Sequence, residues 1–273
     1  MKKLYAIAGA MLLAATAFAQ NESNVFSHFG GSVGIGSTGI TVDLTTNITD
    51  FVGVRAGIDI MPKFTYATTI EIDGVSQRQQ QYDKIRTDYP QLNLPNSHFP
   101  EEVDVEGKMN NTTGHILFDL YPGKKTALHF TVGAYIGSSD PVKVYTTKDE
   151  QLLGVSIYNN STERANAGFQ KIGAQLGDFF LEPDAKGHID AYVKTASFRP
   201  YAGVGIGRNI PRRNPIGVSL DLGAQFWGTP EVFCQGTKLT ASDVEGEDGG
   251  VVKVLTKIKV YPTLTLRMTG KFF

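Results

Sequence analysis

Apolar and polar residues alternate with a period of two along much of the chain. Between residues 216 and 226, apolar side chains occupy the even positions, whereas Ser219, Asp221 and Gln225 occupy odd positions. The same pattern recurs in three further segments: 128–136, 198–206 and 260–268. Because successive side chains of a strand point to opposite faces, each run predicts a strand with one apolar and one polar face.

The alternation predicts eight strands whose connections are alternately short and long. The strands span residues 25–36, 39–48, 51–72, 104–121, 126–138, 188–208, 215–234 and 251–273. Tight turns are expected at 49–50, 122–125 and 211–214, and long polar connections at 73–104, 139–187 and 236–250. Short turns at one end and long loops at the other are typical of outer-membrane barrels, and a run of about 9–11 residues suits a tilted membrane strand. We therefore predict an all-β fold, an antiparallel up-and-down transmembrane β-barrel.

The long connections leave the number of strands open. Residues 140–145 and 179–181 also have strand character, so they either extend the barrel above the membrane or raise the number of strands to ten. Residues 161–176 carry apolar side chains at helical spacing, which predicts either a short surface helix or lid, or a packed loop: Ala165, Phe169, Ile172 and Leu176.

Residues 34–39 read Gly-Ile-Gly-Ser-Thr-Gly, a literal match to the G-x-G-x-x-G pattern of dinucleotide-binding turns. That site requires a helix after the last glycine, because the helix N-terminus holds the pyrophosphate. Residues 40–48 alternate as a strand instead. The glycines therefore predict a β-hairpin, and no nucleotide or other cofactor is expected.

The first residues predict export. Lys2 and Lys3 precede an apolar run, and Ala17-Phe18-Ala19 matches the small-x-small cleavage rule. We expect a signal peptide at residues 1–19 and an outer-membrane β-barrel domain at residues 20–273. The single cysteine, Cys234, excludes an internal disulfide, and a net charge of −1 gives no electrostatic case for a nucleic-acid partner.

Charged residues gather on the polar faces of the predicted strands. They are Asp43, Arg55, Asp59, Asp119, Arg199, Asp221 and Arg267. An eight-stranded barrel is only just wide enough to be filled by its own side chains. Because both signs are present, we expect a packed charge network that fills the lumen, and not a single-sign ring that selects ions.

Two histidines, His115 and His129, also belong to the inward face. Pairing across the predicted turn puts residue 118 opposite residue 129, so the histidines differ in height by about 10 Å, too far apart to share a metal. Asp119 lies closer to His129 and could pair with it. That pair could serve as a relay for lipid hydrolysis, but no serine has an evident place beside it and the chain has no G-x-S-x-G elbow. We favour a structural ion pair and predict no catalytic residue and no metal.

With the signal peptide and the alternating strands, the terminal Lys271-Phe272-Phe273 resembles the outer-membrane β-barrel proteins of double-membraned bacteria. Outer-membrane protein A and its small eight-stranded relatives are the most similar type. The resemblance implies integral outer-membrane localisation, contact with outer-membrane lipid, and an assembly signal at Phe272 and Phe273 read by the barrel-insertion machinery. One departure is that the apolar set of the last strand is one step out of register with Phe273.

The expected function is non-enzymatic, in envelope structure or in surface interaction through the long outer loops. Two alternatives remain open. One is a narrow porin-like conduit for small or hydrophobic molecules, and the other is a lipid-modifying barrel enzyme. The sequence does not identify the extracellular ligand.

Overall fold

The structure of the protein is a computed structural model of the 273-residue chain. It describes residues 28–72, 75–96, 100–109, 111–148, 152–176, 179–212, 214–239 and 259–272. The predicted signal peptide at 1–19 and the terminal Phe273 lie outside the described residues. None of the helices in the described ranges is long and apolar enough to cross a membrane.

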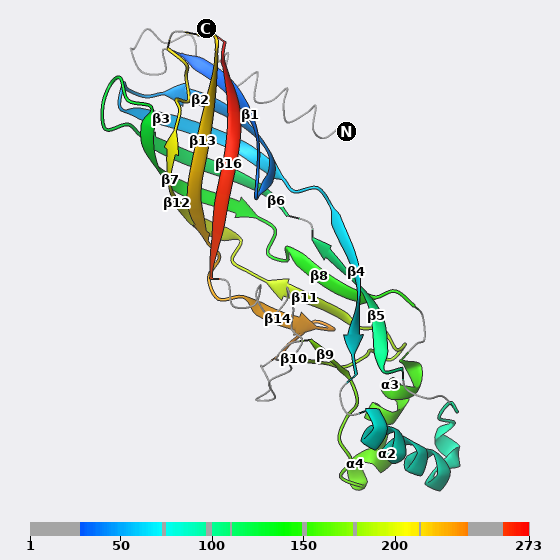
Figure 1. The fold of residues 1–273 in the computed structure, drawn as a ribbon. Coiled ribbons are helices and arrows are strands. Elements are labelled where there is room, and N and C mark those ends of the chain that lie inside the picture. The colour runs from blue at the N-terminus through cyan, green and yellow to red at the C-terminus, as the bar shows by residue number, and fades with distance from the viewer. Residues whose placement is uncertain are drawn as a thin grey trace.

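Eight antiparallel strands close into a barrel at one end of the molecule (Figure 1). They are β1 (Phe29–Gly36), β2 (Gly39–Asn47), β3 (Val52–Ile60), β6 (Thr112–Leu120), β7 (Leu128–Gly137), β12 (Phe198–Ile206), β13 (Ile216–Phe226) and β16 (Val260–Lys271). Each pairs with the barrel strands before and after it in the chain, and β16 closes onto β1. The predicted eight-stranded antiparallel barrel is confirmed, and the ten-stranded alternative is wrong.

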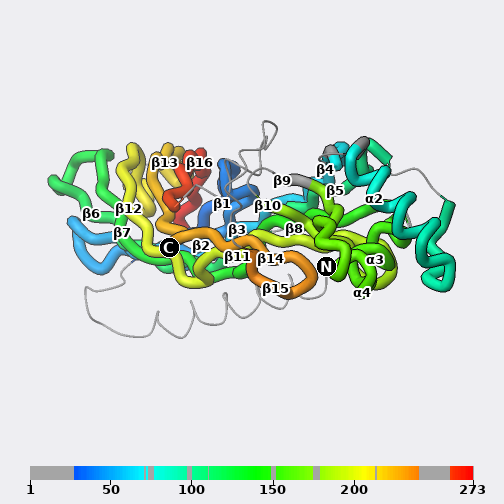
Figure 2. Tube along the Cα trace, turned by 90° about the horizontal axis from the view of Figure 1, so that it is seen from below, coloured from blue at the N-terminus to red at the C-terminus, as the bar shows by residue number. Residues whose placement is uncertain are grey.

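Beyond the barrel, the long connections form a second body, here called the extension (Figures 1 and 2). Its six-stranded sheet has the order β15-β14-β11-β8-β5-β4. These strands are β4 (Phe64–Glu71), β5 (Glu102–Met109), β8 (Val142–Thr146), β11 (Asp190–Lys194), β14 (Glu231–Cys234) and β15 (Thr237–Lys238). A two-stranded sheet pairs β9 (Ala174–Leu176) with β10 (Phe179–Leu181).

Four of the predicted strands each combine a barrel strand with an extension strand. The predicted strand 51–72 is divided into β3 and β4 by residues 61–63, which include Pro62. The same division applies to three others: 104–121, 188–208 and 215–234. The strands expected near 140–145 and 179–181 are β8 and β10, and both lie in the extension.

Helices gather at the end of the extension farthest from the barrel (Figure 1). They are α2 (Val75–Asp88), the 3-10 turn η1 (Pro90–Leu92), α3 (Leu153–Asn160) and α4 (Thr162–Asn166). Of the two alternatives for 161–176, a short helix forms only over α4, which ends before Gly168 with its positive φ of 68°, and residues 167–173 are the packed loop. Ile172 is fully buried in the extension core, so its apolar character reflects packing and not a helical face.

The extension has its own hydrophobic core. Tyr82 of α2 and Tyr158 of α3 are fully buried, with ring centroids 5.7 Å apart. They pack against the inner face of the six-stranded sheet, which contributes Val103, Val105, Val144 and Ala191 among others. This buried apolar surface explains why the long connections fold into a body instead of remaining loops.

The glycines of the G-x-G-x-x-G string form the tight hairpin between β1 and β2. Gly36 pairs with Gly39 across a two-residue loop of Ser37 and Thr38. Gly39 has a φ of +103°, and a Cβ at this position would collide with the carbonyl oxygen of Ile60. The hairpin prediction is confirmed, and the glycines are explained by backbone geometry and close approach.

Cys234 provides a test of the extension core. Burial raises the pKa of its thiol from 9.0 to about 11, and the residue is 5% exposed. In the folded protein we expect slow alkylation at pH 8 that becomes fast in denaturant, since the thiolate is the nucleophile. The folded state holds the proton more tightly, so stability should fall as pH rises from about 9 to 11.

The matched control for this labelling experiment is Thr237→Cys in a Cys234→Ser background. Thr237 lies opposite Cys234 in the sheet but is exposed. Its introduced thiol should react rapidly in the folded protein. Equal reactivity of the two thiols, measured by mass spectrometry of the alkylated chain, would show that β14 is not packed as described.

Candidate functional site

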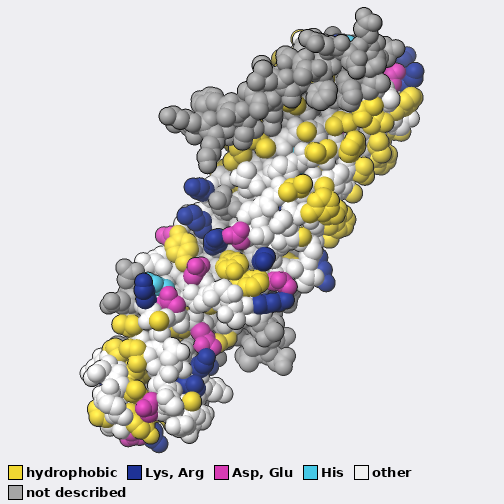
Figure 3. All heavy atoms as spheres, turned by 180° about the vertical axis from the view of Figure 1, so that it is seen from behind, with side chains coloured by type: hydrophobic (Ala, Val, Ile, Leu, Met, Phe, Trp, Pro, Cys, Tyr) yellow, Lys and Arg dark blue, Asp and Glu magenta, His cyan; other side chains and the backbone are white. Residues whose placement is uncertain are grey.

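The outside of the barrel is a continuous apolar belt. In the described chain, every exposed large hydrophobic side chain except Phe64 and Tyr66 lies on a barrel strand or at the end of the barrel with the short turns. Leu220 and Leu222 are 47% and 56% exposed, whereas Ser219 between the belt positions is 2% exposed. Figure 3 shows these apolar side chains clustered over the barrel. Soluble monomers rarely expose apolar surface on this scale, so the belt requires apolar surroundings.

The inside of the barrel is charged. The structure buries all seven of the inward charged residues that the sequence pattern singles out, each at most 3% exposed: Asp43, Arg55, Asp59, Asp119, Arg199, Asp221 and Arg267. Six of them form contacts in two connected clusters along the lumen. The seventh, Arg199, lies apart at the junction with the extension.

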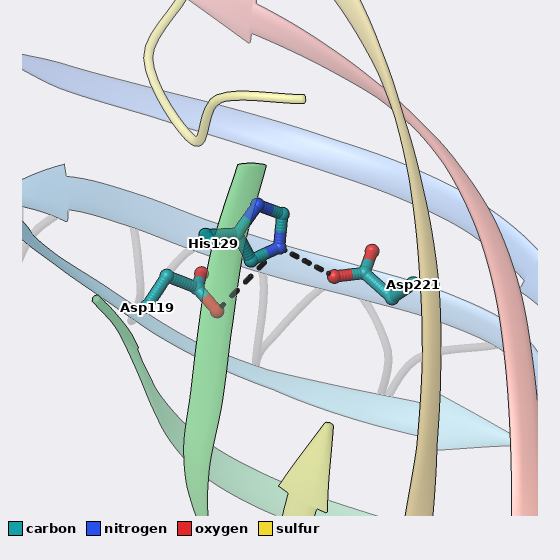
Figure 4. A group of neighbouring side chains, drawn as sticks. All are labelled: Asp119, His129 and Asp221. Carbon is teal, nitrogen blue, oxygen red and sulfur yellow. Dashed lines mark hydrogen bonds and ion pairs between the residues drawn. The ribbon is translucent and has the colours of Figure 1, made fainter. Parts of the chain in front are cut away.

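The first cluster lies toward the short turns and centres on Asp221. One carboxylate oxygen of Asp221 accepts hydrogen bonds from His129 Nε2 at 2.9 Å and Arg55 Nη2 at 3.2 Å, and the other from Arg267 Nε at 2.8 Å. Arg55 also contacts Asp119, with Nε 3.0 Å from Oδ2. Figure 4 shows His129 between the two carboxylates, with Nε2 3.9 Å from Asp119 Oδ1.

The second cluster lies toward the extension and centres on His115. Its ring nitrogens contact two carboxylates, with Nδ1 2.7 Å from Asp59 and Nε2 2.8 Å from Asp43. The hydroxyls of Ser32, Thr38 and Thr41 donate to the same two aspartates. Arg267 Nη1 lies 3.8 Å from Asp43 Oδ2 and so connects the second cluster with the first.

The register predicted across the β6–β7 turn is wrong by three residues. Phe118 pairs with Val132, not with residue 129, because the connection spans residues 121–127 and is longer than the expected four-residue turn. His115 therefore lies opposite Tyr135 and belongs to a different cluster from His129. The shift moves His129 toward the short turns, where it meets Asp221 as well as Asp119.

Hydrogen bonds connect the two histidines of the lumen to its carboxylates. Both ring nitrogens of His115 face carboxylates, and His129 faces Asp221 with Nε2 and the Gly207 carbonyl with Nδ1. Only the doubly protonated imidazolium donates from both nitrogens. In that state the two rings together with Arg55 and Arg267 would match the four aspartates of the two clusters in charge.

The donor set of Asp119, His129 and Asp221 is close enough to suggest a metal site, with ligand atoms within 4.8 Å of one another. The carboxylates are, however, already bonded to guanidinium groups, with Arg55 Nη2 3.1 Å from Asp119 and Arg267 Nη2 2.8 Å from Asp221. A metal ion here would lie beside two fixed positive charges and would have to displace them. The arrangement matches an ion-pair network better than a metal centre.

The His129–Asp119 pair is also remote from lipid. Both residues are 0% exposed inside the barrel, whereas the apolar belt lies on its outer face. Ser219 has a buried Oγ with no hydrogen-bond partner, but it too lies on the inward face of β13. The geometry therefore provides no route for a lipid ester to reach these groups.

Arg199 holds the junction between the barrel and the extension. Its guanidinium donates to the carbonyls of Ala196 at 2.9 Å and Ser138 at 2.6 Å, and to Thr195 Oγ1 at 3.2 Å. The guanidinium carbon also lies 4.7 Å from the Trp227 ring. These groups belong to links between barrel and extension strands, so Arg199 holds those links together and fills the end of the lumen next to the extension.

The other end of the lumen is filled by the β12–β13 connection. Asn209 and Ile210 are 1% and 2% exposed, and Asn209 Nδ2 donates to Asp119 at 2.6 Å. A cavity between the two clusters, lined by Asp43, Arg55 and His115 among others, measures about 10 Å³. That is about the minimum needed for one water molecule, so the lumen is packed with side chains.

Sequence reasoning missed Asn209 and Trp227. The tight turn expected at 211–214 put Asn209 at a strand end, whereas the connection begins at Gly207 and folds inward. Trp227 falls inside the predicted strand 215–234, which in fact ends its barrel part at Phe226. The glycine at 207, with a φ of +133°, is the sequence signal that could have marked the first of these changes.

The predicted assembly signal is described only in part. Phe272 is 55% exposed beyond the end of β16, and Phe273 lies outside the described residues. The apolar parity predicted for this strand holds, since Leu264, Leu266 and Met268 are exposed while Arg267 is 1% exposed. Recognition of Phe272 and Phe273 by the insertion machinery stays a prediction.

Comparison with known proteins gives structural neighbours. The crystal structures of CarO and CarO2 from Acinetobacter baumannii are each 16% identical to this chain, with TM-scores of 0.45, and cover 89% and 90% of it and 97% and 98% of their own chains. Ail, the attachment invasion locus protein of Yersinia pestis, solved with the heparin analogue sucrose octasulfate, is 9% identical with a TM-score of 0.29, covering 90% of this chain and 94% of its own.

No protein-family model matches the sequence, and no curated protein matches it. The chain's own topology defines its fold. Its closed barrel of eight antiparallel strands, joined in sequence order, has the architecture of the small outer-membrane barrels that the strand pattern resembles.

Proposed function

We propose that the protein is an integral outer-membrane β-barrel that does not conduct and that presents the extension for surface interaction. The observation that carries this proposal is the combination of an apolar belt outside the barrel with a buried network of opposite charges inside it. A barrel in water would show the reverse distribution. The network gives the barrel a rigid interior, and the extension supplies the large polar surface that interaction requires.

The direction of insertion follows from the connections. In outer-membrane barrels the short turns face the periplasm and the long connections face outward. The turns at 48–51, 121–127 and 207–215 lie at one end, and the extension lies at the other (Figure 1). The extension is therefore expected outside the cell, where its folded sheet and helices meet external partners or other envelope components.

The packed lumen supports this function over a conduit. A path through the barrel would have to displace Arg199 at one end, Asn209 at the other, and the ion pairs between them. Planar-bilayer recordings should therefore show no steady channels. Regular single-channel steps from the purified protein would favour the porin-like alternative.

The insertion itself has a direct test. In detergent, we expect the unboiled protein to migrate differently from the boiled protein on an SDS gel, because a closed barrel resists SDS until heated. Protease added to intact cells should cut within the extension and spare the barrel. A soluble protein with no heat-dependent shift would contradict the proposal. Lipid A that changes in mass when the protein is expressed would instead support the enzymatic alternative.

A further inference from the structure

Basic residues dominate the end of the barrel with the short turns. Five of them form what we call the basic rim: Lys124, Lys125, Arg208, Arg212 and Lys271. The only acidic residue in the described turns at this end is Asp50. This is a single-sign patch in a chain whose net charge is −1, so it is a local feature and not a consequence of composition.

Internal contacts neutralise little of this charge. Asp50 contacts two members of the rim, with Oδ1 2.9 Å from Arg212 Nη2 and Oδ2 3.4 Å from Lys124 Nζ. One carboxylate balances one positive charge, which leaves four in excess among the described residues at this end. Arg208 donates to the carbonyls of Gly123 and Thr126 and so secures the turn without being neutralised.

The rim borders directly on the apolar belt. Lys124 Nζ lies 5.8 Å from the ring centroid of Phe51, which is 45% exposed. Lys271 ends β16 at the same end of the barrel; it is half-buried on the lumen-facing parity of the strand, whereas the next residue, Phe272, is 55% exposed. In a membrane, exposed aromatic side chains at the end of an apolar belt mark the depth where hydrocarbon gives way to headgroups. The positive groups of the rim therefore lie at the level of the lipid phosphates.

We propose that the basic rim binds the phosphates of anionic phospholipids in the leaflet that surrounds the short turns. This inference rests on the proposed membrane insertion and adds a lipid class to it. Lysine ammonium groups attract the phosphate as point charges, and arginine can bond it through two N–H groups. Because the turns are short and end close to the belt, a lipid headgroup fits the rim better than a polymer that lies farther from the membrane.

The test uses the full-length mature barrel in lipid nanodiscs that contain phosphatidylcholine with a defined fraction of phosphatidylglycerol. Native mass spectrometry then counts the phosphatidylglycerol molecules that stay bound after the protein is released. The variant Lys125→Glu/Lys271→Glu reverses two rim charges and leaves the pairs of Asp50 intact. The control variant Lys84→Glu/Lys186→Glu makes the same charge change at exposed positions in the extension.

We expect the wild type and the control to retain phosphatidylglycerol over phosphatidylcholine, and the rim variant to lose about tenfold of that preference, as expected for loss of charge-assisted contacts. Inorganic phosphate in excess should not displace the lipid. Equal retention by the rim variant and the wild type would overturn the inference, and so would displacement by free phosphate.

The gel test separates this inference from the function on which it rests. A heat-dependent shift in all three proteins, together with unchanged lipid retention, would leave the barrel proposal intact and remove the rim proposal. Loss of the shift in the wild type would overturn both. Loss of the shift in the rim variant alone would itself overturn the assignment of the rim, since Lys125 and Lys271 would then be needed for folding.

Discussion

Replacement of Arg267 by leucine is expected to lower the free energy of unfolding of the barrel by about 3–5 kcal/mol, the usual effect of removing one partner from a buried ion pair. Arg267 is 1% exposed, with Nε and Nη2 each 2.8 Å from Asp221 Oδ2 and Nη1 3.8 Å from Asp43. The substitution would leave four buried aspartates facing one arginine and two histidines. The measurement is urea unfolding of the protein refolded into lipid vesicles.

The matched control is Lys143→Leu, which removes an ion pair that water can replace. Lys143 Nζ lies 2.9 Å from Asp140, but its side chain is 51% exposed. Exposed pairs of this kind contribute about 0–1 kcal/mol. Insertion should survive both changes, because the belt is untouched. If Arg267→Leu destabilises the barrel no more than Lys143→Leu does, the lumen is not a packed charge network.

Strand parity was predictable from the sequence because it depends on one local rule. Leu220 and Leu222 face outward and Asp221 faces inward, as the period of two requires. Register was less predictable, because it depends on the length of each connection. The connection at 121–127 has seven residues, whereas the sequence pattern predicts a four-residue turn, and this difference displaces His129 by three positions.

The sequence pattern does not predict that the long connections fold into a separate body. Helix α2 contains Gln79, Gln80 and Gln81 and buries few side chains, chiefly Tyr82 and Ile85, so it lacks the apolar stripe that reveals a helix. Its strands continue the alternation of the barrel strands, so the period of two alone does not show where the barrel ends. Apolar residues buried in the core of the extension and apolar residues of the belt follow the same alternation in the sequence.

In the candidate site, too, the sequence predicts which face of a strand a residue occupies but not its position along the barrel axis. Parity gave the inward face of all seven charged residues, since each follows the polar face of its strand. It did not give their partners, which depend on register around the whole barrel. Arg199 illustrates this limit, because it meets carbonyls and Trp227 at the junction and contacts none of the aspartates in the two clusters.

Replacement of Leu220 by arginine is expected to reduce the stability of the folded barrel in bilayers by about 2–4 kcal/mol, the usual effect of a positive charge at the midplane of a membrane barrel. Leu220 is 47% exposed near the middle of β13, where it pairs with Ile206 of β12 and Leu266 of β16. Both of these are also exposed apolar side chains. The guanidinium would therefore be surrounded by hydrocarbon, with no acidic partner on the outer face nearby.

Depth provides the control, because the effect of arginine on a barrel falls to about 0–1 kcal/mol near the interface. Val260 is 45% exposed at the first position of β16, at the edge of the belt, so Val260→Arg should be tolerated. Ser219→Arg is unsuitable as a control, because Ser219 is buried and lies opposite Arg267.

The stability of Leu220→Arg and of Val260→Arg is measured by urea unfolding in lipid vesicles. Equal stability of Leu220→Arg and Val260→Arg would mean that this face of β13 does not cross hydrocarbon, whereas a loss confined to Leu220→Arg places the centre of the bilayer at the middle of the strand.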